Sequence, residues 1–170
     1  MGKSKKIAFL DRDGVINKKA EEHYYITRVE DFIFNEGIFG VVSKLKNEGF
    51  EFIVITNQRG VARGLYTEET VRKIHRHMKD EFYKKGIEIL DILYCPHENN
   101  TCECRKPKDG MLREAMELYK FDKTQSLLIS DSVDDVYMGE QFGLGKSIFV
   151  QPNKPSEAMI HLQKSISVVV

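Results

Sequence analysis

Short apolar segments alternate along the chain with longer stretches of helical spacing. The apolar segments are rich in Ile, Val and Phe, and they cover residues Lys6–Leu10, Phe52–Thr56, Ile89–Tyr94, Ser126–Ser130 and Ser147–Val150. Short apolar runs between helical patterns are typical of strands joined by crossover helices in a parallel sheet. The pattern therefore predicts an α/β fold with a doubly wound, Rossmann-like parallel sheet.

Helix signals fill the gaps between these segments. The first predicted helix repeats apolar residues at positions 38, 41, 42 and 45 and stops at Gly49. The second begins after Thr67, a good N-cap, and ends near Gly86. The third follows Asp109, and the fourth runs from Asp134 toward position 143. This order of strands and helices favours one domain over residues 1–170, without a large inserted cap.

Polar and charged residues collect after the first four predicted strands, in the stretches Asp11-Arg12-Asp13-Gly14, Thr56-Asn57-Gln58, Arg105-Lys106-Pro107 and Asp131. In doubly wound sheets the ligand site forms beyond the carboxyl ends of the strands. We therefore expect these side chains to meet in one crevice.

Two carboxylates beside one crevice suit phosphate-ester chemistry. One of Asp11 and Asp13, ionised and in contact with a metal, can attack phosphorus, while the other, kept protonated, can donate to the leaving oxygen. Asp131 is a further oxygen ligand for a divalent metal, most naturally Mg²⁺. An Asp-x-Asp-Gly stretch alone is also common in metal-free turns, so a structural interpretation stays open at this point.

Three further residues complete a phosphate site. Thr56 and Asn57 can donate hydrogen bonds to phosphoryl oxygens, and Lys106 can supply a fixed positive charge. The alternative for Lys106 is a solvated surface lysine.

The motifs are recognisable as a set: Asp11-Arg12-Asp13-Gly14-Val15-Ile16-Asn17, Thr56-Asn57-Gln58-Arg59-Gly60-Val61-Ala62-Arg63-Gly64, Cys104-Arg105-Lys106-Pro107 and Ser130-Asp131. In order and spacing they resemble the motifs of haloacid dehalogenase-superfamily phosphatases over nearly the whole chain. Within that superfamily they look most like the D-glycero-D-manno-heptose 1,7-bisphosphate phosphatases. Histidinol-phosphatase domains are the nearest alternative.

The resemblance implies a phosphomonoesterase that forms an aspartyl-phosphate intermediate. Asp11 would be the nucleophile, and Asp13 the general acid and then the base. Asp11, the Asp13 carbonyl and Asp131 would hold Mg²⁺. In the heptose branch the phosphate at C7 is removed, and the phosphate at C1 remains.

The resemblance also implies substrate-binding roles. Thr56 and Lys106 would bind the transferring phosphate, while Asn57 and Arg105 would orient the substrate. Three loop arginines can meet a second, non-reacting phosphate: Arg59, Arg63 and Arg105. The alternative is that Arg59 and Arg63 are solvent-facing loop residues.

One departure from the family pattern concerns the fourth motif. It usually begins Gly-Asp-Lys or Gly-Asp-Arg, whereas this chain has Ser130-Asp131-Ser132. The metal-binding aspartate is kept, but the basic residue is missing. This departure is the only hint of a further alternative, an inactive zinc-braced binding module.

The cysteines of the chain all lie in one short loop. Cys95, His97, Cys102 and Cys104 offer thiolates and an imidazole with spacing that suits tetrahedral Zn²⁺ in a structural site. Such a site has no open position, so zinc would brace the loop that presents Arg105 and Lys106. The alternative is a reduced surface loop with reactive thiols. The other histidines (His23, His75, His77 and His161) suggest no metal site.

The charge composition limits the classes of molecule that the chain is expected to bind. Lys plus Arg and Asp plus Glu number 26 each, so no global basic field attracts nucleic acid or an anionic membrane. This balance argues against a phosphatase for nucleic-acid 3′ ends. The apolar stretch near the N-terminus is too short for a signal peptide or a membrane span, which favours a cytoplasmic protein. We expect a monomer that binds a small phosphorylated sugar, with residues 15–28 over the mouth of the site and an apolar segment at Ser165–Val170.

Overall fold

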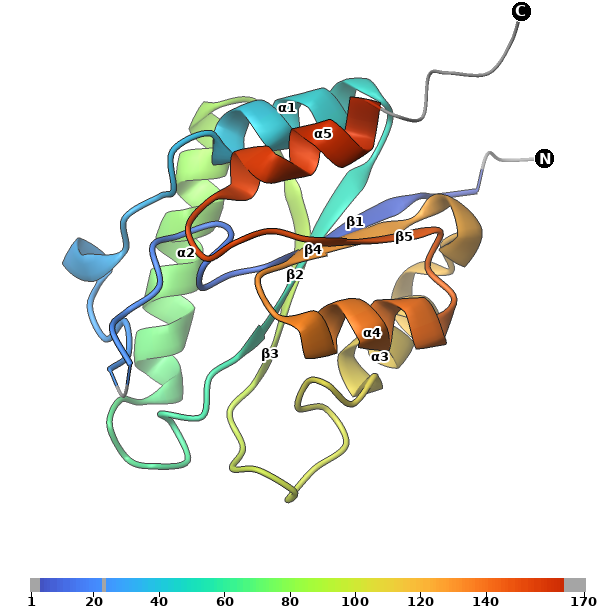
Figure 1. Ribbon diagram of the computed structural model, residues 1–170. Helices are drawn as coiled ribbons and strands as arrows, with labels where there is room; N and C mark the ends of the chain where they lie inside the picture. The colour runs from blue at the N-terminus through green and yellow to red at the C-terminus, as the bar shows by residue number, and fades with distance from the viewer. Residues whose placement is uncertain (1–3, 23, 164–170) are drawn as a thin grey trace, which may run out of the picture.

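The computed structural model of the chain describes residues 4–22 and 24–163. Its strands form one parallel sheet in the order β3-β2-β1-β4-β5 (Figure 1). The strands are β1 (Ile7–Asp11), β2 (Glu51–Asn57), β3 (Ile89–Cys95), β4 (Leu127–Ser130) and β5 (Lys146–Phe149). The predicted doubly wound α/β fold is confirmed, and every predicted strand is present to within one residue at each end. His23 and the segment Ser165–Val170 lie outside the described residues.

Helices cover both faces of the sheet (Figure 1). They are α1 (Ile38–Asn47), α2 (Glu68–Lys84), α3 (Gly110–Tyr119), α4 (Val133–Phe142) and α5 (Ala158–Gln163), with 3₁₀ turns at Val29–Asp31, Lys123–Gln125 and Pro155–Glu157. The first four helices are the predicted ones. The sequence pattern did not predict α5, because a helix this short carries too few turns for a periodic signal.

The observed N-termini of α2 and α4 can be compared with the predicted ones. Thr67 caps α2 as predicted, because its hydroxyl accepts a hydrogen bond from the Thr70 N–H at 3.2 Å, a contact type that contributes about 1 kcal/mol. The predicted start of α4 at Asp134 is wrong by one residue. The helix begins at Val133, because the Ser132 hydroxyl accepts from the Asp135 N–H at 3.4 Å and acts as the N-cap.

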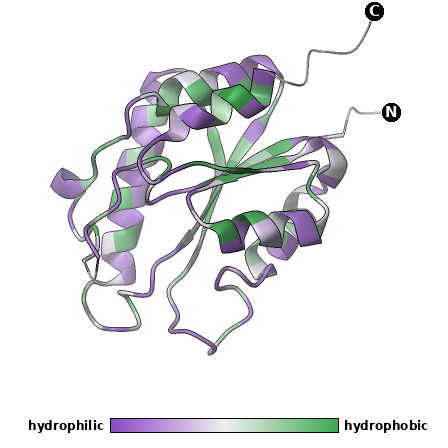
Figure 2. Cartoon of the chain, in the orientation of Figure 1, coloured by the Kyte–Doolittle hydropathy of each residue, from purple (hydrophilic) through white to green (hydrophobic). Residues whose placement is uncertain are grey.

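Side chains alternate between two apolar cores along β1, β2 and β4. Ala8 and Leu10 of β1 pack into the core formed with α1, α2 and α5, while Ile7 and Phe9 pack into the core formed with α3 and α4. Figure 2 shows the strands as mainly hydrophobic and the helices as two-faced. Burial on both faces explains why the central strands β1, β2 and β4 are mainly apolar rather than alternating.

The chain order places a switch point between β1 and β4. From β1 the chain steps outward to β2 and β3, and it then returns to the other side of β1 for β4 and β5. Crevices at such points bind ligands in doubly wound sheets. Within the described residues, the connection from β1 to α1 contains only isolated bridges and the turn Val29–Asp31, and no inserted domain. No described helix is long and apolar enough to cross a membrane.

Candidate active site

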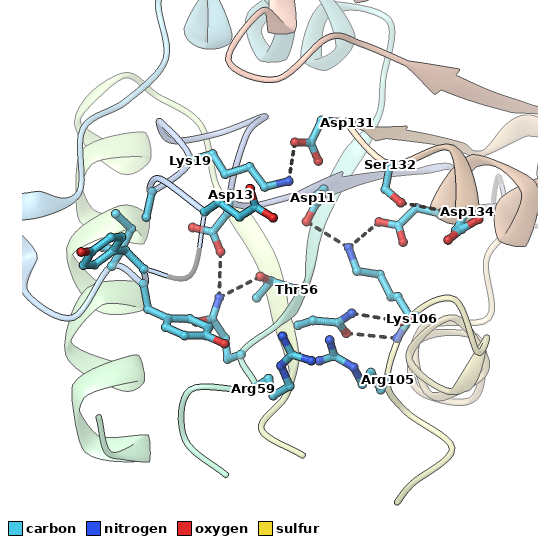
Figure 3. Close-up of a pocket in the computed structure, with 18 of the residues that line it drawn as sticks. Asp11, Asp13, Lys19, Thr56, Arg59, Arg105, Lys106, Asp131, Ser132 and Asp134 are labelled. Carbon is cyan, nitrogen blue, oxygen red and sulfur yellow. Dashed lines mark hydrogen bonds and ion pairs between the residues drawn. The ribbon is translucent and has the colours of Figure 1, made fainter. Parts of the chain in front are cut away.

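A cavity of about 580 Å³ lies beyond the carboxyl ends of the central strands (Figure 3). Its volume is in the range of small-molecule sites. The cavity is lined by every residue predicted for phosphate, substrate and Mg²⁺: Asp11, Asp13, Thr56, Asn57, Arg59, Arg63, Arg105, Lys106 and Asp131. Tyr24 and Tyr25, from the segment expected over the mouth, line it as well.

A buried lysine joins two carboxylates at the floor of the cavity. Lys106 Nζ lies 2.9 Å from Asp11 Oδ1 and 2.6 Å from Asp135 Oδ2, and its side chain is 4% exposed. Burial acts to lower the pKa of Lys106, but the two carboxylates outweigh it and raise that pKa above its usual value. Lys106 is therefore a fixed cation and not a solvated surface lysine.

Asp11 is the last residue of β1 and has polar neighbours at both oxygens. The Arg12 backbone N–H donates to Oδ1 at 2.9 Å, and the Ser130 hydroxyl lies 3.2 Å from Oδ2. Burial raises the pKa of Asp11 to about 7; Lys106 opposes this shift, whereas Asp135 and Asp131 add to it. A further positive charge near these carboxylates would therefore favour the ionised form of Asp11.

Lys19 places its ammonium group on the carboxylate of Asp131. Lys19 Nζ lies 2.9 Å from Asp131 Oδ2, and the Asp131 side chain is 1% exposed. The Lys19 backbone N–H donates to Asn153 Oδ1 at 2.8 Å, which anchors this segment. Gly14 has a φ of +88°, and a Cβ there would clash with the Asp131 carboxylate. Lys19 thus occupies one oxygen of the carboxylate predicted to hold Mg²⁺. The oxygen donors of Asp11, Asp13 and Asp131, which line the same cavity, are of the type that suits a hard divalent ion.

The two oxygens of Asp13 have different partners. Oδ1 accepts from Arg12 Nη2 at 2.9 Å, Arg12 Nε at 3.2 Å and Asn17 Nδ2 at 3.0 Å. Oδ2 accepts from Gln58 Nε2 at 3.1 Å. Burial acts to raise the pKa of Asp13, but Arg12, Asn17 and Gln58 together hold it below its ordinary value.

Gln58 links Asp13 to Thr56. Its Nε2 also donates to Thr56 Oγ1 at 2.9 Å, and its Oε1 accepts from the Tyr66 hydroxyl at 2.6 Å. Because Tyr66 donates to the carbonyl oxygen, the amide has one orientation, in which it donates to both Asp13 and Thr56.

Asn57 holds the backbone of the lysine loop. Its Nδ2 donates to the Lys106 carbonyl at 3.0 Å, and its Oδ1 accepts from the Lys106 N–H at 3.0 Å. The amide predicted to orient substrate therefore also fixes the position from which Lys106 enters the site.

The three loop arginines, Arg59, Arg63 and Arg105, line the cavity. Arg63 Nε lies 2.9 Å from Glu98 Oε2, Arg59 Nη1 lies 3.5 Å from Glu98 Oε1, and Arg105 Nε donates to Asn99 Oδ1 at 2.7 Å. Among the described residues, Arg59 Nε and Arg105 Nη1 are buried without a hydrogen-bond partner. Buried guanidinium N–H groups need an acceptor, so this wall suits an anion.

The predicted zinc ligands converge in the loop after β3. One ligand atom from each of Cys95, His97, Cys102 and Cys104 lies within 4.8 Å of all the others. The Cys95 and Cys102 sulfurs are 3.5 Å apart, and His97 Nδ1 is 3.2 Å from the Cys104 sulfur. Zn–S bonds of about 2.3 Å place two sulfurs of a tetrahedron roughly 3.8 Å apart, so the donor set fits Zn²⁺.

The serines of the altered fourth motif have structural partners. The Ser130 hydroxyl lies 2.8 Å from Asp135 Oδ2 and accepts from the Ser132 N–H at 3.1 Å. Ser132 is the N-cap of α4, as described above. A basic residue of another segment, Lys19, contacts the aspartate of this motif.

Sequence patterns assigned no contact or role to four residues near the site: Arg12, Lys19, Gln58 and His75, which contacts Arg12. Arg12 and Gln58 stand inside recognised motifs, so their position was a usable signal. Lys19 lies in an irregular segment and His75 on a helix face, where spacing alone does not reveal a partner.

The comparisons with known proteins agree with this geometry. The sequence model described as polynucleotide kinase 3 phosphatase matches residues 6–155. The chain belongs to this family of phosphatases, and the predicted resemblance to haloacid dehalogenase-superfamily phosphatases is confirmed.

Similar proteins within the superfamily carry heptose phosphatase names. The D-glycero-alpha-D-manno-heptose-1,7-bisphosphate 7-phosphatase of Campylobacter jejuni is 40% identical over 149 residues, which cover 88% of this chain and 84% of the relative. The corresponding beta-heptose enzyme of Vibrio cholerae is 36% identical over 160 residues, which cover 89% and 84%. The D,D-heptose 1,7-bisphosphate phosphatase from B. bronchiseptica, solved with magnesium and phosphate, has a TM-score of 0.79 and 29% identity, with coverage of 92% and 86%.

His75 of α2 lies behind this site. Its Nε2 is 3.1 Å from Arg12 Nη1, and the residue is 5% exposed. Burial, and then the charge of Arg12, lower the pKa of His75 to about 3, although Asp13 opposes the shift. The imidazole is therefore neutral at ordinary pH.

We expect His75→Gln to flatten the acid side of the stability profile. The unfolded chain binds a proton at His75 below pH ~6.5 and the folded chain only near 3, so wild-type stability is complete above 6.5 and falls as pH decreases through this window. Between pH 7.5 and 5 the wild type should lose about 2 kcal/mol more unfolding free energy than the variant. Urea unfolding at both pH values measures this difference, and equal losses would contradict a neutral, buried His75.

Proposed function

We propose that this chain is a magnesium-dependent phosphomonoesterase that removes the C7 phosphate of D-glycero-D-manno-heptose 1,7-bisphosphate through an aspartyl-phosphate intermediate. The observation that carries the proposal is the buried Lys106 beside Asp11, at the end of β1 and inside the cavity. The names of the relatives at 36% and 40% identity support the substrate.

Asp11 is the nucleophile in this proposal. One of its oxygens attacks the C7 phosphorus, and the bond from phosphorus to the C7 oxygen breaks. Lys106 donates hydrogen bonds toward the transferring phosphoryl group, whose charge it balances. Thr56 lines the same cavity and offers its hydroxyl hydrogen to a phosphoryl oxygen, because its oxygen already accepts from Gln58.

Asp13 acts as general acid and then as general base. It gives a proton to the departing C7 oxygen, which leaves as an alcohol. It then takes a proton from the water that attacks the aspartyl phosphate. Inorganic phosphate leaves and Asp11 is regenerated.

Magnesium fits the carboxylates around the switch point. Asp11, the Asp13 carbonyl and Asp131 would hold the ion, which offsets the repulsion between the phosphate and the carboxylates. The magnesium and phosphate of the B. bronchiseptica structure support this assignment.

A second phosphate suits the arginine wall. Arg59 Nε and Arg105 Nη1 are buried donors of the cavity wall without a partner among the described residues, and Arg63 lines the same cavity. This feature supports a bisphosphate over a monophosphate, with the non-reacting phosphate against the arginines.

Zinc in the thiol cluster would brace the loop that carries Arg105 and Lys106. The four ligands leave no open position, so the ion would be structural. Reduced thiols are the rule in the cytoplasm, which supports the cytoplasmic location that we propose.

Two other substrates have specific support. Histidinol phosphate is suggested by the related motifs, and a 3′-phosphorylated nucleic acid by the description of the matching family. The balanced charge of the chain disfavours nucleic acid.

We expect strong phosphate release from D-glycero-D-manno-heptose 1,7-bisphosphate in the presence of Mg²⁺. Asp11→Asn should lower the rate by at least about 10³-fold, because the amide is not a nucleophile. Release of phosphate is measured beside histidinol phosphate and a 3′-phosphorylated oligonucleotide. Turnover of one of these instead would keep the chemistry and overturn the substrate, and no turnover would favour the inactive binding module.

We expect Lys19→Met to bind Mg²⁺ roughly 3- to 10-fold more tightly, because Mg²⁺ and the half-exposed Lys19 compete for Asp131. Calorimetric titration with Mg²⁺ alone measures this affinity. Lys18→Met is the matched control, since it removes the same charge from the neighbouring residue. Equal affinities of the two variants would show that the contact with Asp131 does not compete with the ion.

We expect the purified protein to contain about one zinc ion per chain and Cys104→Ser to lose it. The variant should lose phosphatase activity, because the zinc-braced loop presents Lys106. It should keep its far-ultraviolet circular dichroism, because the sheet and helices do not depend on this loop. Metal content is measured by mass spectrometry, with the exposed Glu103→Gln as control. Full activity in a zinc-free variant would refute the bracing role.

A further inference from the structure

Arg12 is a buried cation that does not line the cavity. The residue is 1% exposed, and its Nε and Nη2 both donate to Oδ1 of Asp13. The guanidinium also lies over the ring of Phe32, 5.8 Å from its centroid. Arg12 thus contacts one oxygen of the proposed general acid from the side away from substrate.

The remaining terminal nitrogen of Arg12 meets His75. A guanidinium can only donate, so the contact of 3.1 Å requires Nε2 of His75 to be the acceptor. The histidine therefore carries its proton on Nδ1. Its ring packs against Tyr94 with centroids 5.6 Å apart, which limits its rotation. Without His75, the Nη1 group would be buried without this acceptor, an arrangement that costs free energy.

This arrangement makes the two oxygens of Asp13 unequal. Oδ1 is held by Arg12 and Asn17, whereas Oδ2 accepts a hydrogen bond from Gln58 alone among the residues that the structure describes. An oxygen with three donors is a poor site for a proton, so Oδ2 is the oxygen that exchanges one.

We propose that His75 is a positioning residue that acts through Arg12 to hold Asp13 with Oδ2 toward the leaving group. It touches neither substrate nor metal in this role. The inference rests on the proposed function, because it assigns a supporting residue to the general acid of that reaction.

The chemistry offers a readout that a purely structural role would not change. An alkyl leaving group, such as a sugar hydroxyl, needs a proton as its bond to phosphorus breaks, whereas nitrophenolate leaves without one. The ratio kcat/KM reports the steps through this first bond cleavage. Loss of Asp13 positioning should therefore lower kcat/KM for the sugar phosphate and spare it for p-nitrophenyl phosphate.

The experiment compares His75→Leu and His75→Gln on both esters with Mg²⁺ present. We expect His75→Leu to lower kcat/KM for heptose bisphosphate on the order of 10-fold or more, part of the ~10²- to 10⁴-fold that acid–base catalysis supplies. The change on p-nitrophenyl phosphate should stay below about 3-fold. His75→Gln should restore most of the loss, because its amide oxygen can accept from Arg12.

Two controls separate the inference from folding effects. His77→Leu makes the same change two residues along α2, where the ring packs against Phe32 and Phe34 with centroids 6.0 and 6.5 Å apart. His77→Leu should change kcat/KM by the same factor for the sugar phosphate and for p-nitrophenyl phosphate. Arg12→Lys keeps the charge beside Asp13 but loses the forked contacts, and it should show the selective loss even if His75→Leu fails to fold.

The outcomes distinguish this inference from the proposed function. Asp13→Asn should lower kcat/KM for the sugar phosphate more than the His75 variants do, and it should again spare p-nitrophenyl phosphate. If it does so while the His75 and Arg12 variants lose both activities equally, or neither, the positioning role is wrong. If wild type fails on heptose bisphosphate, the proposed substrate is wrong, and glycerol 3-phosphate then serves as the alkyl ester for the same comparison.

Discussion

The contact of Lys106 with Asp11 and Asp135 is the interaction on which the site depends. An ammonium group this deeply buried costs several kcal/mol unless carboxylates and hydrogen bonds surround it. Its partners come from β1 and α4, while Lys106 itself comes from the loop before α3. One buried charge thus fixes the relative position of three parts of the chain at the switch point of the sheet.

The loop that carries Lys106 has no regular structure, so other contacts must hold it. The Asn57 amide pairs with the Lys106 backbone, and the thiol cluster gathers the segment just before it. Gly110 begins α3 against this loop, where a Cβ would clash with the Glu103 carbonyl. The end of a strand, the thiol cluster and the start of a helix therefore act together to place one side chain.

The sequence predicted the strands and many of the cavity-lining residues for one physical reason. In a parallel sheet the residues after buried apolar runs meet at one edge, so Asp11, Thr56 and Asp131 were found from position alone. The partners outside this rule were not found. Lys19 reaches Asp131 through an irregular segment, and the contact of His75 with Arg12 depends on the rotation of α2 against the sheet. Both are set by packing, which single-sequence periodicity does not encode.

The two carboxylates that flank Arg12 show why ligands matter to the proposed roles. Burial and neighbouring carboxylates raise the pKa of Asp11, while Arg12 and its partners overcome burial and lower the pKa of Asp13. A divalent cation beside Asp11 favours its ionised form, and a phosphate dianion beside Asp13 favours its protonated form. Both shifts run toward the nucleophile and acid that catalysis needs. In the proposed mechanism the reactive protonation states would therefore arise when metal and substrate are bound together, which ties the proposed chemistry to the complete complex.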